Sequence, residues 1–105
     1  MKKTSVVVSI LLMLAIAVAA QPAGTILLNA AGATFPYPIY SKWFDVYHQK
    51  DPNVQINYQS IGSGGGIRQL LAGTVDFGAS DGPMTDDQLK EAKFKILHFP
   101  TVLAP

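Results

Sequence analysis

From residue 25 onward, short apolar runs alternate with segments that carry helical periodicity. The apolar runs predict strands at 25–30, 53–60, 74–80 and 96–102, and a helical pattern lies in each interval between them. Strands that alternate with helices are typical of a mainly parallel sheet with helices packed on its faces. The chain therefore predicts an α/β fold with the element order β-α-β-α-β-α-β.

Local signals place the three predicted helices. The first begins near Pro36 and Pro38, and proline suits the first turn of a helix because the amide hydrogen that it lacks has no partner there. The second follows a glycine-rich segment at 61–66, which we interpret as a flexible turn. The third carries a capping box, with Thr85 as the N-cap and Gln88 three residues later.

The amino-terminal segment has the three parts of a secretory signal peptide. Lys2 and Lys3 are followed by an apolar run over 6–20 that ends in small residues. A membrane anchor is the alternative, but the run is shorter than the roughly 20 residues that a spanning helix needs. We therefore expect 1–20 to be removed on export to the periplasm and 21–105 to form the folded part.

Composition excludes several classes of site. The chain has no Cys, so disulfides, thiol catalysis and cysteine–zinc sites are excluded. Without Lys2 and Lys3, the 8 basic residues fall to 6 against 7 acidic ones, which leaves no basic field for nucleic acid. His48 and His98 have no metal-ligand spacing to each other or to an acid. We therefore predict no metal, no cofactor and no nucleic-acid partner.

Three loops should meet at one edge of the predicted sheet, because ligands of such sheets bind beyond the carboxyl ends of the strands. The first, "GATFP", places Gly32, Ala33 and Thr34 just before a helix. Unpaired amide groups near a helix start attract anions, and the Thr34 hydroxyl adds a donor. The alternative is that Thr34 serves only as the N-cap of that helix.

The second loop, "GSGGG", repeats this design. Its glycines allow a ligand to approach the backbone, and Ser63 offers a hydroxyl. It matches neither the P-loop nor the dinucleotide fingerprint, so an ordinary flexible turn is the alternative. Arg68, one turn further on, we expect to face solvent.

The third loop, "SDGP", places the carboxylate of Asp81 beside two loops that favour anions. A carboxylate repels an anion unless that anion carries a proton for it to accept. Monohydrogen phosphate carries such a proton near neutral pH and sulfate does not, so Asp81 would accept one and reject the other. The alternative is that Asp81 only forms a turn before Gly82-Pro83.

Together these loops resemble the PstS family, the exported phosphate-binding receptors of bacterial phosphate ABC transporters. The resemblance rests on "AAGATFPYPIYSKW" at 30–43, "NYQSIGSGGGIRQL" at 57–70 and "TVDFGASDGPMTDDQL" at 74–89, and "FPTVLAP" also fits the family's next strand. It implies a type II periplasmic-binding fold, in which an anion is held between two α/β lobes. Only part of the first lobe would be present here, and no catalytic step is implied.

The resemblance also implies residue roles and partners. Thr34 and Ser63 would donate through their hydroxyls, Phe35 through its backbone N–H, and Asp81 would accept the phosphate proton, with Ala33 in the same contact segment. The partners would be inorganic phosphate and the membrane permease and ATPase subunits of the transporter. The receptor itself is expected to be a monomer.

Some alternatives remain open. A receptor for molybdate, tungstate or sulfate would share the fold, as would a phosphate-binding surface protein with no role in transport. An exported phosphatase using Asp81 or Ser63 is disfavoured, because no His or metal cluster is placed to activate Ser63. The apolar end at 96–103 suggests a truncated chain. Since the family's second lobe supplies an Arg and a Ser-Gly-Thr loop, we expect the fragment alone not to bind phosphate tightly.

Overall fold

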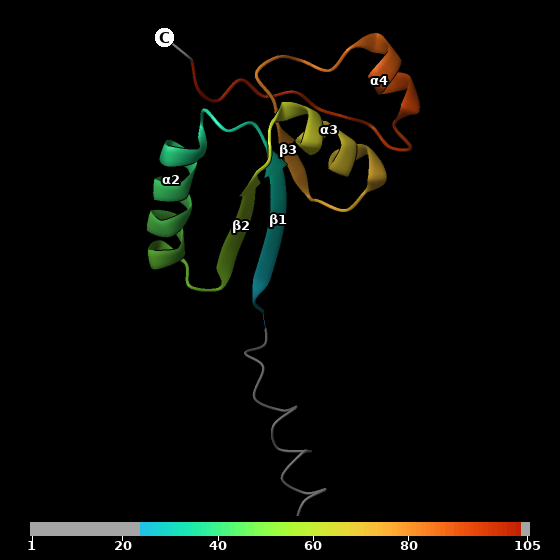
Figure 1. Ribbon diagram of the computed structural model, residues 1–105. Helices are drawn as coiled ribbons and strands as arrows, with labels where there is room; N and C mark the ends of the chain where they lie inside the picture. Colours follow the sequence, from blue (N-terminus) through green and yellow to red (C-terminus); the bar gives the residue numbers. More distant parts are fainter. Residues whose placement is uncertain (1–23, 104–105) are drawn as a thin grey trace, which may run out of the picture.

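The computed structural model of the protein describes residues 24–103, and three strands and three helices lie within that range (Figure 1). The predicted signal peptide at 1–20 lies outside the described residues. None of the helices within 24–103 is long and apolar enough to cross a membrane.

The strands form one parallel sheet. They are β1 (Ile26–Gly32), β2 (Val54–Ser60) and β3 (Phe77–Ala79), in the order β2-β1-β3. In the register of the sheet, Ala30 of β1 lies opposite Tyr58 of β2 and Phe77 of β3. The predicted parallel α/β architecture is therefore confirmed, and all three strands point their carboxyl ends to the same edge.

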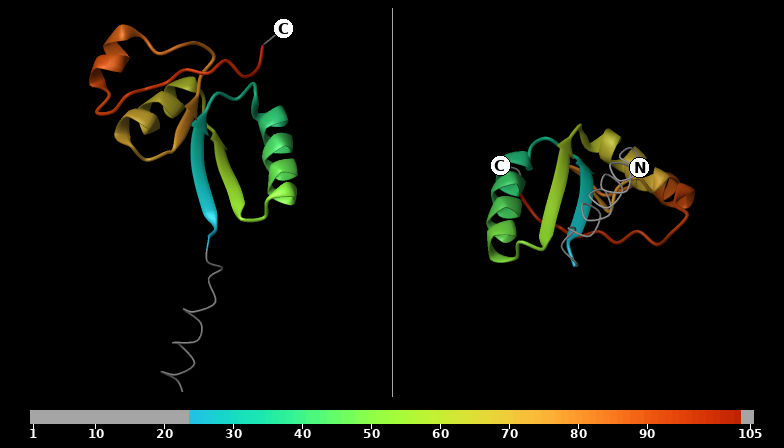
Figure 2. Two further views of the ribbon diagram at one scale, coloured as in Figure 1. Left: turned by 180° about the vertical axis from the view of Figure 1, so that it is seen from behind. Right: turned by 90° about the horizontal axis from the view of Figure 1, so that it is seen from below.

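The two longer helices cover opposite faces of this sheet (Figure 2). Helix α2 (Tyr37–Lys50) connects β1 to β2, and α3 (Ser63–Ala72) connects β2 to β3. The chain moves from β1 to β2 on one side and then back past β1 to β3 on its other side. Because both crossovers are right-handed, they must run over opposite faces of the sheet. The loops that precede α2 and α3 are thereby brought to the carboxyl edge.

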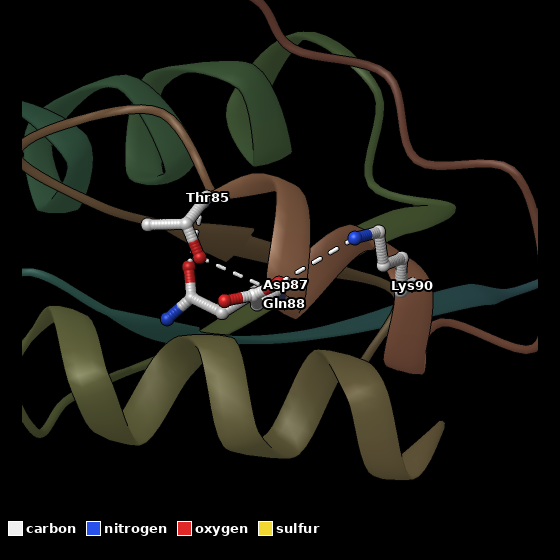
Figure 3. Close-up of polar contacts among 4 residues, drawn as sticks. All are labelled: Thr85, Asp87, Gln88 and Lys90. Atoms are coloured by element: carbon white, nitrogen blue, oxygen red, sulfur yellow. Dashed lines mark hydrogen bonds and ion pairs between the residues drawn. The ribbon is translucent and has the colours of Figure 1, made fainter.

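The capping box predicted for the short helix α4 (Asp86–Glu91) is confirmed (Figure 3). The Thr85 hydroxyl accepts from the Gln88 amide at 3.3 Å, and the Gln88 side-chain oxygen accepts from the Thr85 amide at 2.9 Å. Lys90 and Asp87 form an exposed ion pair at 3.6 Å, which contributes little to stability.

The predicted fourth strand at 96–102 is wrong. This segment is extended, but it forms no ladder with the sheet and instead crosses from α4 toward α2 at the carboxyl edge (Figures 1 and 2). Side chains hold it there, because the His98 ring nitrogen accepts from the Met84 amide and Thr101 bonds the Tyr40 hydroxyl. An apolar sequence favours a strand, but a ladder also needs a neighbouring strand with free backbone groups, and β3 has only three residues.

Most of the glycine-rich segment is also not the flexible turn that we predicted, because α3 begins at Ser63 and includes Gly64, Gly65 and Gly66. Gly66 explains why glycine is used. A β-carbon at Gly66 would lie 2.5 Å from the Gly32 α-carbon and 2.6 Å from the Ala31 carbonyl oxygen. The helix therefore rests directly on the backbone of β1, which compensates for the low helix propensity of glycine.

The interior of the described part is small. Its buried apolar residues are Ala30, Ala31, Ala33, Tyr40 and Met84. Aromatic rings extend this core on the α2 face of the sheet, where the Tyr40 and Tyr58 rings meet edge to face with centroids 5.4 Å apart. Phe44 joins them and makes an edge contact with Phe77 of β3. This cluster ties α2 to β2 and β3.

The contact between α3 and β1 predicts opposite effects for two neighbouring glycines. Gly66→Ala should lower the free energy of unfolding by about 1–3 kcal/mol, because the new methyl group would overlap backbone atoms that cannot move aside. Gly64→Ala should raise it by about 0.4–1 kcal/mol, because its methyl group would meet only the mobile end of Arg68 at 3.5 Å. Urea unfolding of the chain measures both. Equal effects of the two substitutions would show that α3 does not pack as described.

Candidate anion-binding site

Backbone hydrogen bonds tie the three predicted loops together at the carboxyl edge of the sheet. The Gly32 carbonyl accepts from the amides of Ile61 and Gly62, at 3.1 and 2.9 Å. The Ala33 amide donates to the Ala79 carbonyl at 2.9 Å. The loops after β1, β2 and β3 therefore begin in contact with one another, as the topology predicted.

Ser63 and Asp81 come together at this edge although 18 positions separate them. The Asp81 amide donates to the Ser63 side-chain oxygen at 3.0 Å. A hydroxyl has one hydrogen and can accept as well, so accepting from Asp81 leaves the Ser63 hydrogen available to another acceptor. Asp81 is exposed, and so this edge of the sheet carries a hydroxyl donor and a carboxylate acceptor on two residues that are in contact.

In the first loop, Thr34 and Phe35 are the exposed residues. The N-cap of α2 is Pro36, with no side-chain cap, so the interpretation of Thr34 as that N-cap is wrong. Proline at 36 and 38 has no amide hydrogen, and the Tyr37 amide donates to the Thr34 carbonyl at 3.1 Å. The donors that this loop can offer a ligand are therefore the Thr34 hydroxyl and the Thr34 and Phe35 amides.

Ala33 is the buried residue at the start of this loop, and it is 1% exposed. Its amide hydrogen is bound by Ala79, and its carbonyl accepts from the Tyr58 hydroxyl at 2.6 Å. Both of its backbone polar groups are thus engaged within the protein. Ala33 holds the loop in place, and its amide is not free for a ligand.

Tyr58 is a residue of this region that sequence reasoning missed. Burial is the main cause that raises the pKa of its hydroxyl from 10.0 to about 12, and the charges of Tyr40 and Asp81 raise it further. The hydroxyl therefore keeps its proton, and remains a donor, at any physiological pH. Its position in the apolar alternation of β2 indicates only a core residue, so no sequence signal distinguished it.

Arg68 and His48 are the other polar side chains that the sequence analysis considered. Arg68 is exposed, and its guanidinium lies along the first turn of α3 beside Gly64. His48 contacts the Val54 carbonyl at 2.8 Å, away from the three loops. Among residues 24–103, no three His, Asp or Glu side chains gather in a way that would hold a metal ion.

An apolar groove of about 520 Å³ opens at the other end of the sheet, between α2 and the first residues of β1 and β2. Aliphatic and aromatic side chains line it, so its chemistry differs from that of the three loops. Its lining residues are Ile26, Leu28, Trp43, Phe44, Tyr47, Val54 and Ile56.

Residues 18–105 match the sequence profile of a family described as the PBP superfamily domain, and the chain belongs to that family. Two relatives are phosphate-binding proteins PstS. The protein from Pasteurella multocida (strain Pm70) is 51% identical over 76 residues, which is 72% of this chain and 21% of the relative. The protein from Haemophilus influenzae is also 51% identical over 76 residues, or 72% of this chain and 22% of the relative. The chain thus spans about a fifth of the length of these relatives.

Solved structures share the fold. A phosphate-binding protein of a phosphate ABC transporter from Streptococcus pneumoniae TIGR4 superposes with a TM-score of 0.58 at 27% identity, covering 64% of this chain and 26% of that one. A possible phosphate-binding protein from Planctomyces limnophilus gives a TM-score of 0.60 at 22% identity, covering 64% and 24%. The predicted fold class, part of a periplasmic-binding-protein lobe, is confirmed.

The raised pKa of Tyr58 predicts a loss of stability at alkaline pH. The folded state holds the Tyr58 proton up to about pH 12, whereas the unfolded chain releases it near 10.0. The free energy of unfolding should therefore fall as the pH rises between these values. Tyr58→Phe should lose less stability than the original chain between pH 9 and pH 11.5, as measured by urea unfolding. Parallel pH profiles of the two proteins would contradict the buried, hydrogen-bonded hydroxyl.

Proposed function

We propose that the chain is the phosphate-contacting part of an exported receptor that binds inorganic phosphate and delivers it to an ABC importer. The observation that carries this proposal is the contact between the Asp81 amide and the Ser63 side-chain oxygen, 3.0 Å long. It supports the proposal because it joins Ser63, the proposed hydroxyl donor, to Asp81, the proposed carboxylate acceptor, at the edge of the sheet where the loop that carries Thr34 also begins. The curated relatives from P. multocida and H. influenzae, which bear the name phosphate-binding protein, support the same ligand.

Each residue has a distinct role in the proposed site. The Thr34 and Ser63 hydroxyls and the Phe35 amide donate to phosphate oxygens, while Ala33 anchors the first loop from below. The Asp81 carboxylate accepts the proton of monohydrogen phosphate. A fully ionised oxyanion such as sulfate, molybdate or tungstate brings no such proton, so it would meet a like charge and an unpaired acceptor. Asp81 thus makes phosphate the preferred ligand.

Export and delivery belong to the same proposal. In it, 1–20 is a signal peptide, 21–105 is the first part of a two-lobed receptor in the periplasm, and the second lobe supplies the remaining anion contacts. The membrane permease and ATPase subunits of the transporter are the proposed partners of a monomeric receptor. No catalytic step is assigned, because within 24–103 Ser63 contacts an amide donor rather than a base that would activate it.

A chimera tests the ligand and the role of Asp81. The described residues 24–103 would replace the matching region of the P. multocida protein, and calorimetry would measure phosphate and sulfate binding. We expect phosphate to bind and sulfate not to bind. Asp81→Asn should weaken phosphate binding by about 10–100-fold or admit sulfate, because a hydrogen bond to a charged group is lost.

Asp87→Asn is the matched control, because Asp87 is an exposed acid of α4 whose partner is Lys90. It should leave phosphate binding unchanged. A chimera that does not bind phosphate, or that binds sulfate equally well, would reject the proposed function. Equal effects of Asp81→Asn and Asp87→Asn would leave Asp81 as a turn residue only.

The 105-residue chain alone should bind phosphate more weakly than about 1 μM, because it holds the donors of one side of the anion only. Titration with phosphate, followed by amide chemical shifts, measures this affinity. The chimera described above provides the comparison. Micromolar or tighter binding by the isolated chain would contradict the need for a second lobe.

A further inference from the structure

We propose that Tyr58 is a positioning residue whose hydroxyl aims the Thr34 amide hydrogen at the bound anion. The inference rests on the proposed function, since it assigns the Thr34 amide to the same phosphate site. Tyr58 itself would not contact the ligand. Its role would be to hold one peptide group of the first loop in a single orientation.

The geometry of one peptide unit carries the argument. The Tyr58 hydroxyl donates to the Ala33 carbonyl at 2.6 Å in a partly buried position. The peptide group that joins Ala33 to Thr34 is planar, and residues 24–103 contain no cis peptide bond. In a trans peptide the N–H points away from the C=O. Tyr58 therefore holds the carbonyl on one side and directs the Thr34 amide hydrogen to the other.

The Tyr58 side chain, which donates this hydrogen bond, is itself held in place. Tyr58 sits in β2 opposite Ala30, and its ring makes an edge contact with Tyr40 at 5.4 Å and stacks on Tyr37 at 6.1 Å. A side chain held by its backbone ladder and by two rings loses little further entropy when its hydroxyl forms a bond. The raised pKa keeps the proton on this hydroxyl.

The second hydrogen bond of Ala33 does not fix the peptide group between Ala33 and Thr34, so the bond from the Tyr58 hydroxyl is needed to hold it. The Ala33 amide donates to Ala79 at 2.9 Å, which fixes the peptide group before Ala33. The peptide group after it can still rotate about the backbone bonds on either side of it. Within the described residues, the hydrogen bond from Tyr58 is the one that the Ala33 carbonyl accepts. Without it, the Thr34 amide would sample other directions, and binding would require it to be ordered first.

Tyr40 provides a matched control in the same aromatic cluster. Its hydroxyl also makes a 2.6 Å hydrogen bond in a partly buried position, but the partner is the Thr101 hydroxyl rather than a loop carbonyl. Tyr40→Phe and Tyr58→Phe thus each remove one hydroxyl and keep the ring. The two substitutions should have similar effects on stability and different effects on phosphate binding.

The experiment uses the chimera with the P. multocida protein and phosphate as the probe. Tyr58→Phe should weaken phosphate binding about 5–10-fold, because one ordinary hydrogen bond that orders the Thr34 amide is lost. Tyr40→Phe should change it less than twofold. In ¹⁵N spectra, phosphate should shift the Thr34 amide strongly in the original chimera and in Tyr40→Phe, and more weakly in Tyr58→Phe.

The outcomes separate this inference from the proposed function. If the original chimera does not bind phosphate, both fall together. If it binds phosphate but Tyr58→Phe binds equally well, or Tyr40→Phe loses as much, only the inference falls. A ligand-free measurement adds a further check, since the ¹³C resonance of the Ala33 carbonyl should move in Tyr58→Phe and not in Tyr40→Phe. An unmoved resonance would also overturn the inference.

Discussion

The close approach of three backbones at Gly32 is the constraint on which the site depends. A β-carbon at Gly32 would overlap the Ala79 carbonyl, and its φ of +151° is one that other residues rarely adopt. The Gly32 carbonyl accepts hydrogen bonds from the amides of Ile61 and Gly62, and Gly66 packs against the Gly32 α-carbon. Strand β1, helix α3 and the end of β3 can therefore meet without an intervening side chain. The loops that leave this point therefore start in contact with one another.

Features with a local cause could be predicted from the sequence. The parallel sheet follows from the alternation of patterns, and the capping box at Thr85 depends on residues three positions apart. The errors at 61–66 and 96–102 have a common cause, because each outcome depends on distant partners. Glycines with poor helix propensity form α3 because Gly66 must lie on Gly32, and an apolar segment remains unpaired where the sheet offers it no ladder.

The candidate site likewise has features that the sequence predicts and features that depend on distant partners. The meeting of Ser63 and Asp81 followed from the rule that carboxyl ends of parallel strands share an edge, and the structure shows it as a direct contact. The engagement of Ala33 and the bond from Tyr58 could not be read in this way. A tyrosine on the apolar face of a strand has the pattern of a core residue, and only the fold shows which carbonyl its hydroxyl reaches.

In the proposed receptor, these contacts would let a chain without a basic field bind an anion. The donors at the site are uncharged hydroxyls and amides, so they lose less on dehydration than charged groups do. Such donors are useful only if they already point at the ligand, because turning them during binding costs free energy. The Ser63 oxygen accepts from the Asp81 amide, and so its hydrogen is left for a ligand oxygen. The same contact brings the Asp81 backbone beside Ser63, so in the proposed receptor one hydrogen bond would leave the Ser63 donor free and hold the residue whose carboxylate selects a protonated anion.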